Sequence, residues 1–120
     1  MDTILLKYHA EDTDYLIYDV RRNQHTPDQK MMRALCAKNF ALGSEGILVG
    51  PAGEGASMHM KLFLADGREA TVNDRDREVS DQYLTDAGYL QEQSANDGKS
   101  YMTGKIFLPE NFMNKKYAVA

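Results

Sequence analysis

The chain has 120 residues, of which 42% are hydrophobic and 27% are charged, so it is long enough to bury a core and fold as one domain. Its formal net charge is -4, and the basic residues are scattered among acidic ones, which argues against nucleic-acid binding. The longest apolar runs are far shorter than a membrane span, and the N-terminus has no signal-like pattern. With Cys36 as the single cysteine, we expect no internal disulfide and a cytoplasmic location.

The first two predicted elements are strands. Residues 3–9 (TILLKYH) are apolar and extended in character, and residues 15–20 (YLIYDV) are rich in aromatic and β-branched side chains. The acidic segment between them predicts a loop, and residues 21–25 predict a polar connection.

An amphipathic helix is predicted over residues 27–39. Thr26 is suited to cap it and Pro27 to occupy its first position. The apolar side chains that recur at helical spacing are Met31, Met32, Leu35, Cys36 and Phe40. Because free cysteine is among the most buried residue types, we expect Cys36 to lie in the core.

The middle of the chain predicts short strands and a hairpin. Residues 47–49 predict a buried strand, and the glycine-rich residues 51–57 predict an exposed loop. Residues 58–65 predict a central strand that returns over residues 69–72. The Asp-Gly pair between them predicts a tight turn in which both central residues have positive φ.

A second helix is predicted to follow Asn73, which can form a capping box with Asp76. The apolar residues on one face of this helix are Val79, Tyr83, Leu84 and Ala87. Gly88 is suited to end the helix.

The last part of the chain predicts a polar loop over residues 91–100 and strands at 101–103 and 105–108 around a bulge at Gly104. Residues 117–119 predict a final strand or a tail. The order of elements predicts an α+β fold in one domain, residues 1–120, with a mixed or antiparallel sheet.

Three segments together resemble the N-terminal domain of the diaminopimelate epimerase family. Residues 7–15 (KYHAEDTDY) match the family's H-x-x-G-N-D-[FY], with Asp12 and Thr13 in place of glycine and asparagine. Residues 40–48 (FALGSEGIL) follow F-G-x-G-[AS]-D-G, and residues 63–69 (FLADGRE) follow F-N-x-D-G-S-E. The motifs keep the family's order and spacing from residue 4 to about residue 90, and residues 91–120 have no counterpart.

The resemblance implies a sheet wrapped around one helix, with a second helix beside it. It also implies an active site between two such domains, of which this chain has the length of one. In the family, C-G-N-G follows the hairpin, and its cysteine transfers the α-proton of an amino acid. By register that position is Asn73 here. An amide is not a general base near neutral pH, so we do not expect two-cysteine epimerisation.

The resemblance also implies a carboxylate site at the start of the second helix, where backbone amides bind anions. Here Asp74 and Asp76 would repel a carboxylate, and Arg75 would offset this only in part. The family's substrate-binding asparagines correspond to Thr13 and Leu64, and leucine supplies no hydrogen bond. The ligand-binding positions implied by the resemblance are therefore Asn73, Arg75, Thr13 and Leu64.

Outside this motif, the candidate residues are histidines and carboxylates. His9, His25 and His59 lack the spacing of a metal motif, so no metal site and no cofactor are expected. His9 ends a strand near the inferred cleft. The carboxylates considered as a general acid or base are Asp12, Asp14, Glu45, Asp66 and Glu69, and Asp14 is the best of them.

Three hypotheses about function follow. The first is a non-catalytic or accessory binding protein that acts as a homodimer or with a partner protein, because a lone domain leaves its inter-domain face uncovered. The second is a cofactor-independent enzyme, such as an isomerase, dehydratase or cyclase, that uses Asn73, Asp14, His9 and Arg75 on a small molecule. The third is a truncated or engineered domain without an independent function.

Overall fold

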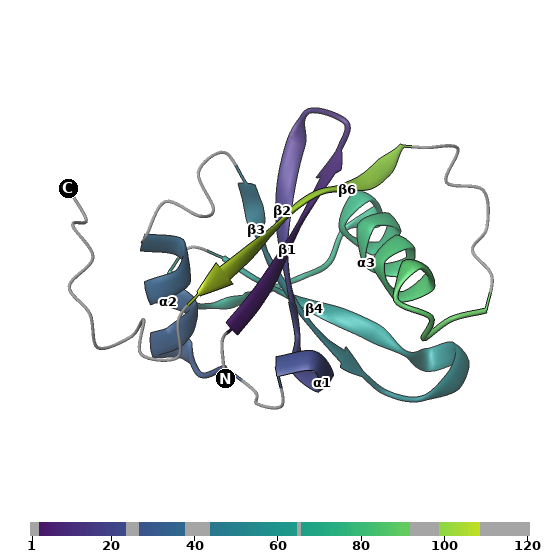
Figure 1. Ribbon diagram of the computed structural model, residues 1–120, viewed down its shortest axis with the longest axis horizontal. Helices are drawn as coiled ribbons and strands as arrows, with labels where there is room; N and C mark the ends of the chain where they lie inside the picture. The colour runs from purple at the N-terminus through teal and green to yellow at the C-terminus, as the bar shows by residue number, and fades with distance from the viewer. Residues whose placement is uncertain (1–2, 24–26, 38–43, 65, 92–98, 109–120) are drawn as a thin grey trace.

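The computed structural model describes residues 3–23, 27–37, 44–64, 66–91 and 99–108. Strands and helices follow one another along the chain (Figure 1). The elements are β1 (Thr3–Ala10), β2 (Thr13–Asp19), α1 (Val20–Asn23), α2 (Gln29–Ala37), β3 (Ser44–Ala52), the 3₁₀ turn η1 (Gly55–Ser57), β4 (His59–Phe63), β5 (Glu69–Ala70), α3 (Asp74–Asp86) and β6 (Ser100–Leu108).

The described strands form one six-stranded sheet in the order β5-β4-β3-β2-β1-β6. β2 and β3 run parallel, and every other neighbouring pair runs antiparallel. The crossover from β2 to β3 contains α1 and α2, because parallel neighbours need a long connection. The sheet is therefore mixed, and the predicted α+β class is confirmed.

Each face of the sheet packs against a different helix. On β1 and β2, Leu6, Tyr8, Tyr15 and Ile17 belong to one buried cluster with Val79, Tyr83 and Leu84 of α3. The intervening residues Leu5, Leu16 and Tyr18 belong to a second cluster with Met31, Met32 and Leu35 of α2. This division follows from the alternation of side chains along a strand. We call the two sides of the sheet the α3 face and the α2 face.

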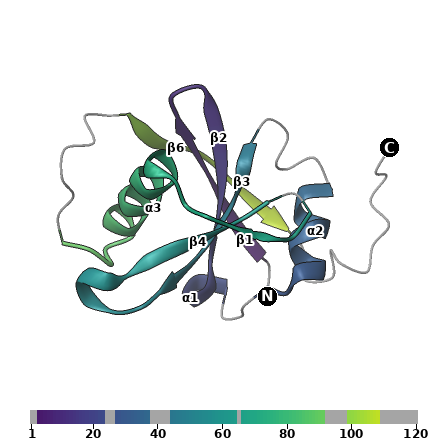
Figure 2. The same cartoon turned by 180° about the vertical axis from the view of Figure 1, so that it is seen from behind.

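The sheet bends around α3. This helix contacts β4 and β6, which lie near opposite ends of the strand order, and it also contacts β1. Figures 1 and 2 show α2 and α3 on opposite sides of the crossing strands. The predicted arrangement of a sheet wrapped around one helix, with a second helix beside it, is confirmed.

The predicted first helix begins later than expected. α2 starts at Gln29, because the Asp28 carboxylate accepts a hydrogen bond from the Met31 N–H at 2.8 Å and so caps the helix. Pro27 therefore precedes the helix and does not occupy its first position. Thr26 and residues 38–39 lie outside the described residues.

The short helix α1 replaces the predicted polar connection over residues 21–25. The Asp19 carboxylate, only 3% exposed, accepts hydrogen bonds from the N–H groups of Arg21 and Arg22 at 2.8 and 3.1 Å. The Asn23 side chain bonds to both the N–H and the carbonyl of Ile4, which fixes the end of α1 to β1. The feature of the sequence that indicates this short helix is Asp19, whose side chain caps it.

The Asp-Gly turn has a glycine with positive φ, as predicted. Gly67 has a φ of 86°. The Gly67 N–H donates to the Leu64 carbonyl at 2.9 Å, and the Arg68 N–H donates to the Asp66 carboxylate at 3.0 Å. A Cβ at Gly67 would lie 2.7 Å from Cγ of Gln29, so the turn packs tightly against the start of α2.

Strand lengths in the middle of the chain also differ from those expected. β3 extends from Ser44 to Ala52, well beyond the predicted residues 47–49, and includes a cis Gly50–Pro51 bond. The predicted loop is therefore shorter and contains η1. β5 comprises only Glu69–Ala70 of the predicted residues 69–72.

The second helix and the last strand follow the predictions closely. The Asn73–Asp76 capping box starts α3, and Gly88, with a φ of 85°, ends it through hydrogen bonds from Gly88 to Thr85 and from Tyr89 to Leu84. β6 pairs with β1, and a register shift opposite Lys7 and Tyr8 leaves Thr103 as a bulge next to Gly104. Residues 117–119 lie outside the described residues. Within the described ranges, no helix has the length and apolar character needed to cross a bilayer.

Hydrogen bonds between tyrosines and aspartates attach α3 to the sheet. At its first turn the Tyr15 hydroxyl donates to Asp76 at 2.6 Å, and at its last turn the Tyr8 hydroxyl donates to Asp86 at 2.6 Å. The Tyr83 hydroxyl donates in the reverse direction, from α3 to Asp19 at the end of β2.

Replacing Tyr83→Phe should lower the free energy of unfolding by about 1–3 kcal/mol, because a buried carboxylate loses one of its donors while the packed ring stays. Chemical denaturation would measure the change. Tyr101→Phe is the matched control, because it also removes a tyrosine hydroxyl, but from a side chain that is 50% exposed. Equal stability of the two variants would contradict a structural role for the Tyr83–Asp19 bond.

Candidate functional site

The predicted catalytic position lies at the start of α3 and is occupied by a complete capping box. Asn73 has an extended backbone, and its Oδ1 accepts a hydrogen bond from the Asp76 N–H at 2.8 Å. In return the Asn73 N–H donates to Oδ2 of Asp76 at 2.9 Å. The side chain of Asn73 is therefore used to begin the helix.

Asp76 continues this network into the core. It is 1% exposed, and its Oδ1 accepts the hydroxyl of Tyr15 at 2.6 Å. Burial and this hydrogen bond raise the pKa of Tyr15 above its ordinary value, so Tyr15 stays protonated and acts as a donor. The Arg75 Nε also donates to the Tyr15 hydroxyl oxygen, at 3.1 Å.

Arg75 links this network to the turn between β1 and β2. Its Nη1 lies 3.7 Å from the Glu11 carboxylate and 3.9 Å from the Asp12 carboxylate. Glu11 adopts a left-handed backbone with a φ of 57°, which tightens the turn. Both carboxylates are exposed, so these ion pairs contribute little to the free energy of unfolding. They do offset the positive charge of Arg75 at the start of α3.

His9 and Asp14 form a separate pair. His9 Nδ1 lies 2.7 Å from Oδ1 of Asp14, and each side chain is about one-third exposed. The His9 ring is also 5.7 Å from the ring of Tyr101 on β6. The hydrogen bond to Asp14 raises the pKa of His9, since the carboxylate favours the protonated ring.

The predicted site residues do not converge on one cleft. Asn73 and Arg75 lie with Tyr15 on the α3 face. His9 and Asp14 are partners in the β1–β2 register, and strand alternation places both on the α2 face. The structure therefore brings His9 to Asp14 on one face of the sheet, and on the other face it joins Asn73 to Arg75 through Asp76 and Tyr15.

The other two ligand-binding candidates have structural surroundings. Thr13 is half-buried and pairs with Ala10 at the end of the β1–β2 hairpin. Leu64 is half-buried and packs against the α3-face core, and its N–H donates to the Arg68 carbonyl at 2.9 Å. Neither residue contributes a polar side-chain contact to the network around Asn73 in the described part of the chain.

The remaining candidates are scattered. His59 is exposed and bonds through Nδ1 to the Ser57 carbonyl at 2.9 Å, and Asp66 serves its turn and pairs with Arg68. His25 and the side chains of Cys36 and Glu45 lie outside what the structure describes. Across the described ranges, no group of three or more histidine, cysteine, aspartate or glutamate residues is arranged to hold a metal ion.

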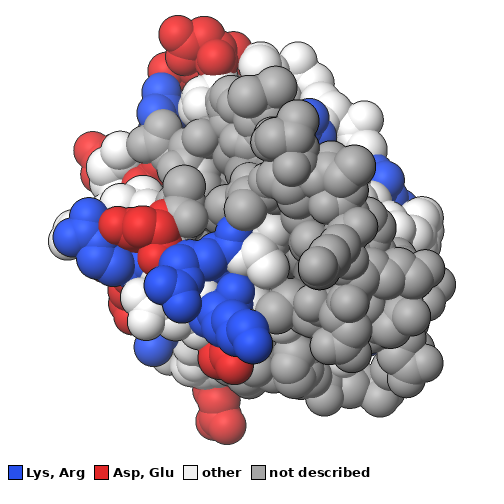
Figure 3. All heavy atoms as spheres, turned by 90° about the vertical axis from the view of Figure 1, so that its left-hand side faces the viewer, with Lys and Arg blue, Asp and Glu red and all other residues white. Residues whose placement is uncertain are grey.

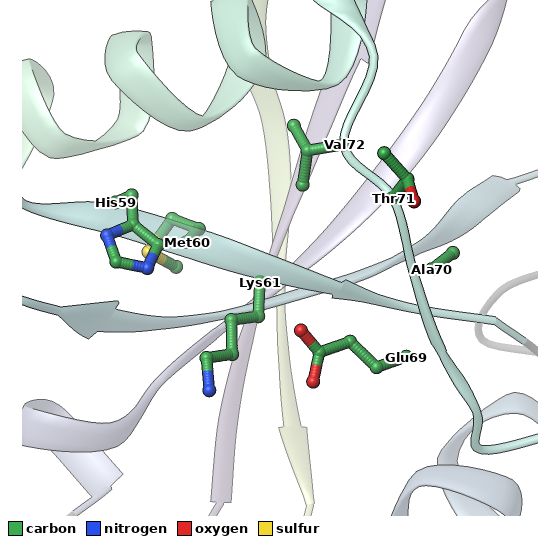
Figure 4. A pocket seen from close by; sticks show the side chains of 7 residues that line it. All are labelled: His59, Met60, Lys61, Glu69, Ala70, Thr71 and Val72. Carbon is green, nitrogen blue, oxygen red and sulfur yellow. The ribbon is translucent and has the colours of Figure 1, made fainter.

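A hollow of about 380 Å³ lies beside β4, where the chain leaves β5 (Figure 4). Its walls include His59, Lys61 and Glu69, all of which are exposed. Figure 4 shows Lys61 and Glu69 on the same side of β4, with Val72 turned the other way. On the part of the surface that Figure 3 shows in colour, several basic side chains lie together, with acidic side chains next to them.

Sequence reasoning missed Tyr15 as part of the network at the helix start. One feature of the sequence could have pointed to Tyr15: it is a tyrosine at an inward-facing position of a core strand, and a buried hydroxyl needs a hydrogen-bond acceptor. The acceptor, Asp76, lies 61 residues away in sequence, so no local pattern could have paired them.

Replacing Asn73→Ala should lower the free energy of unfolding by about 1 kcal/mol, because the Asp76 N–H loses its acceptor. Asn73→Ser is the matched control and should retain most of the stability, since serine also caps helices. Thermal and urea denaturation would measure both variants. An alanine variant as stable as the serine variant would show that the cap is dispensable.

Comparison with known proteins places this geometry in context. No protein-family model matches the chain. The chain is 33% identical over 88 residues to diaminopimelate epimerase 2 of Nostoc sp., which covers 72% of the chain and 31% of that protein. It is 28% identical over 91 residues to the diaminopimelate epimerase of Methanothrix thermoacetophila, covering 73% of the chain and 33% of that protein.

A third relative extends the similarity. The diaminopimelate epimerase of Methanocella arvoryzae is 26% identical over 106 residues, which covers 87% of the chain and 36% of that protein. The chain thus spans about a third of the length of the curated relatives it matches. The chain is therefore similar to the diaminopimelate epimerases over one part of their length, in the manner of a single N-terminal-like domain with an α+β fold.

Proposed function

We propose that this domain is a degenerate epimerase-like half that serves as a non-catalytic or accessory binding protein and acts as a dimer or with a partner chain. The observation that carries the proposal is the capping box at the start of α3. Both functions that the epimerase resemblance assigns to this helix start, proton transfer and carboxylate binding, are replaced there by internal hydrogen bonds.

Proton transfer lacks a suitable group at Asn73. A general base must accept a proton from the substrate within hydrogen-bond distance. The Asn73 amide has no basic lone pair near neutral pH, and its Oδ1 already accepts the Asp76 N–H. The Tyr15 hydroxyl belongs to the same network, but it is held protonated by burial and by Asp76.

Carboxylate binding is opposed by Asp76. A helix start attracts anions through its unpaired N–H groups and its positive dipole end. Here the chain supplies its own carboxylate, which bonds to the N–H of Asn73 and to the hydroxyl of Tyr15. A substrate carboxylate would have to displace a buried side chain that is already satisfied.

The separation of the candidate residues also supports a non-catalytic role. The alternative, an enzyme that uses Asn73, Arg75, His9 and Asp14 together, needs them in one cleft. His9 and Asp14 lie on the α2 face, whereas Arg75 contacts Tyr15 on the α3 face. A ligand in contact with one pair would therefore not reach the other.

The chain should not exchange the α-protons of diaminopimelate, the amino acid named in its relatives. Incubation with LL-diaminopimelate in D2O, followed by proton NMR, should show loss of the α-proton signal only at the rate of buffer alone. The epimerase of Nostoc sp. is the positive control. Exchange that rises with protein concentration, and falls in Asn73→Ala or Asp14→Ala variants, would overturn the proposal.

Association is supported by the edge strand β6. This strand ends the sheet, so one of its edges faces no other strand within the described residues. Its large exposed apolar side chains are Tyr101, Met102 and Phe107. An unpaired strand edge with apolar side chains is a surface on which proteins associate.

Sedimentation of the chain should therefore show a concentration-dependent dimer or a complex with a partner. Phe107, 63% exposed, is the best point to test, and Phe107→Ser should weaken a dimer at least about tenfold because each buried phenylalanine contributes about 1.5–3 kcal/mol. Thr71→Ser, beside β5 at the opposite edge of the sheet, is the control. A wild-type chain that sediments as a monomer at high concentration and captures no partner would contradict this part of the proposal.

A further inference from the structure

A second cavity lies at the opposite end of α3 from Asn73. It has a volume of about 290 Å³ and is lined by residues of β1, β6, α1 and the end of α3. Its buried wall is formed by Leu6, Tyr8 and Tyr83. The two tyrosine rings lie edge to face, with centroids 5.8 Å apart and planes at 87°. This size suits a small molecule of a few rings or branches.

The tyrosine wall is apolar in character. The Tyr8 hydroxyl donates to Asp86 and the Tyr83 hydroxyl donates to Asp19, so both hydroxyl hydrogens are used within the protein. Burial raises the pKa of both tyrosines, which keeps them neutral. What remains for a ligand is ring surface, which favours an aromatic or large aliphatic group. Met102, 46% exposed at the rim, adds further apolar surface.

The rim of the cavity carries charges of both signs. Lys105 is exposed, and no carboxylate of the described residues lies within ion-pair distance of its ammonium group. Arg22 also lines the cavity, and its Nε lies 3.9 Å from the Asp19 carboxylate. Asp86 accepts hydrogen bonds from Tyr8 and Gln82, both neutral donors, so its negative charge is not offset by an ion pair.

We propose that this cavity binds a zwitterionic small molecule with an apolar body, of the class of α-amino acids with an aromatic or large aliphatic side chain. The apolar body packs on the rings of Tyr8 and Tyr83. The carboxylate is bound by Lys105 and Arg22, and the ammonium group is bound by Asp86.

The position of the cavity on α3 favours this orientation. Asp86 is the last residue of the helix, where the unpaired carbonyl groups and the negative end of the dipole attract cations. A ligand ammonium group is therefore stabilised at Asp86, while its carboxylate is placed toward the cations supplied by β6 and α1. Since α3 has 13 residues, the cavity lies about 18 Å from the capping box and is independent of it.

Three ligands that share one ring separate the charge requirements. L-phenylalanine carries both charges, 3-phenylpropionate lacks the ammonium group, and phenethylamine lacks the carboxylate. NMR titration of the full chain should show that L-phenylalanine shifts the signals of Met102 and Lys105. The other two ligands should bind about tenfold more weakly, because each loses one charged hydrogen bond.

Two variants assign the charges, with a third as control. Lys105→Ala should weaken binding of L-phenylalanine about tenfold, and Lys99→Ala, an exposed lysine just before β6, should leave it unchanged. Asp86→Asn keeps an acceptor for Tyr8 and should abolish the preference for L-phenylalanine over 3-phenylpropionate. Equal affinity for all three ligands, equal effects of the two lysine variants, or ligand shifts confined to the surroundings of Asn73 would overturn the proposal.

Discussion

The hydrogen bonds between buried tyrosine hydroxyls and aspartate carboxylates determine where α3 lies. Asp19 and Asp76 are almost completely buried, and a buried carboxylate is tolerated only when donors surround it. Asp76, in the first turn of α3, accepts a hydrogen bond from the Tyr15 hydroxyl. Asp19 accepts one from the hydroxyl of Tyr83, which lies toward the end of α3. Both ends of the helix are thus attached to β2. The bend of the sheet follows, because β4 and β6 must both reach a helix that is fixed at its two ends.

The same interactions divide the molecule into two regions of different character. At the start of α3, the side chains of Asn73, Asp76 and Tyr15 form hydrogen bonds with one another and with the backbone. Few of their polar atoms are left to bind a ligand. At its end, the tyrosines and aspartates satisfy one another and leave ring surface and unpaired charge around a cavity. Under the proposed function the start of α3 therefore serves stability, and the opposite end of the helix offers the surface for a ligand.

Local patterns predicted most of the secondary structure. The strands at residues 3–9 and 58–65, the capping box of α3 and its glycine stop were each recognisable from a few neighbouring residues. The errors arose where two local signals competed. Thr26-Pro27 resembled a helix start, but Asp28 supplies the cap, and the polar residues after Asp19 resembled a loop because a buried carboxylate cap was not expected there. The Asp-Gly turn also packs against Gln29, a contact that the sequence of the turn does not reveal.

The sequence by itself determined most of the elements and the capping box at Asn73, because each depends on residues within a few positions of one another. It also determined the similarity to one part of the epimerases, because several short motifs keep their order and spacing along the chain. Only the tertiary structure decided which side chains meet. Tyr8 and Asp86 are 78 residues apart, and Tyr83 and Asp19 are 64 apart, so their pairing depends on how the strands cross α3. Strand register likewise placed His9 and Asp14 on the face opposite to Arg75, although the motif suggested one cleft. A shift of one residue in that register would have exchanged the faces.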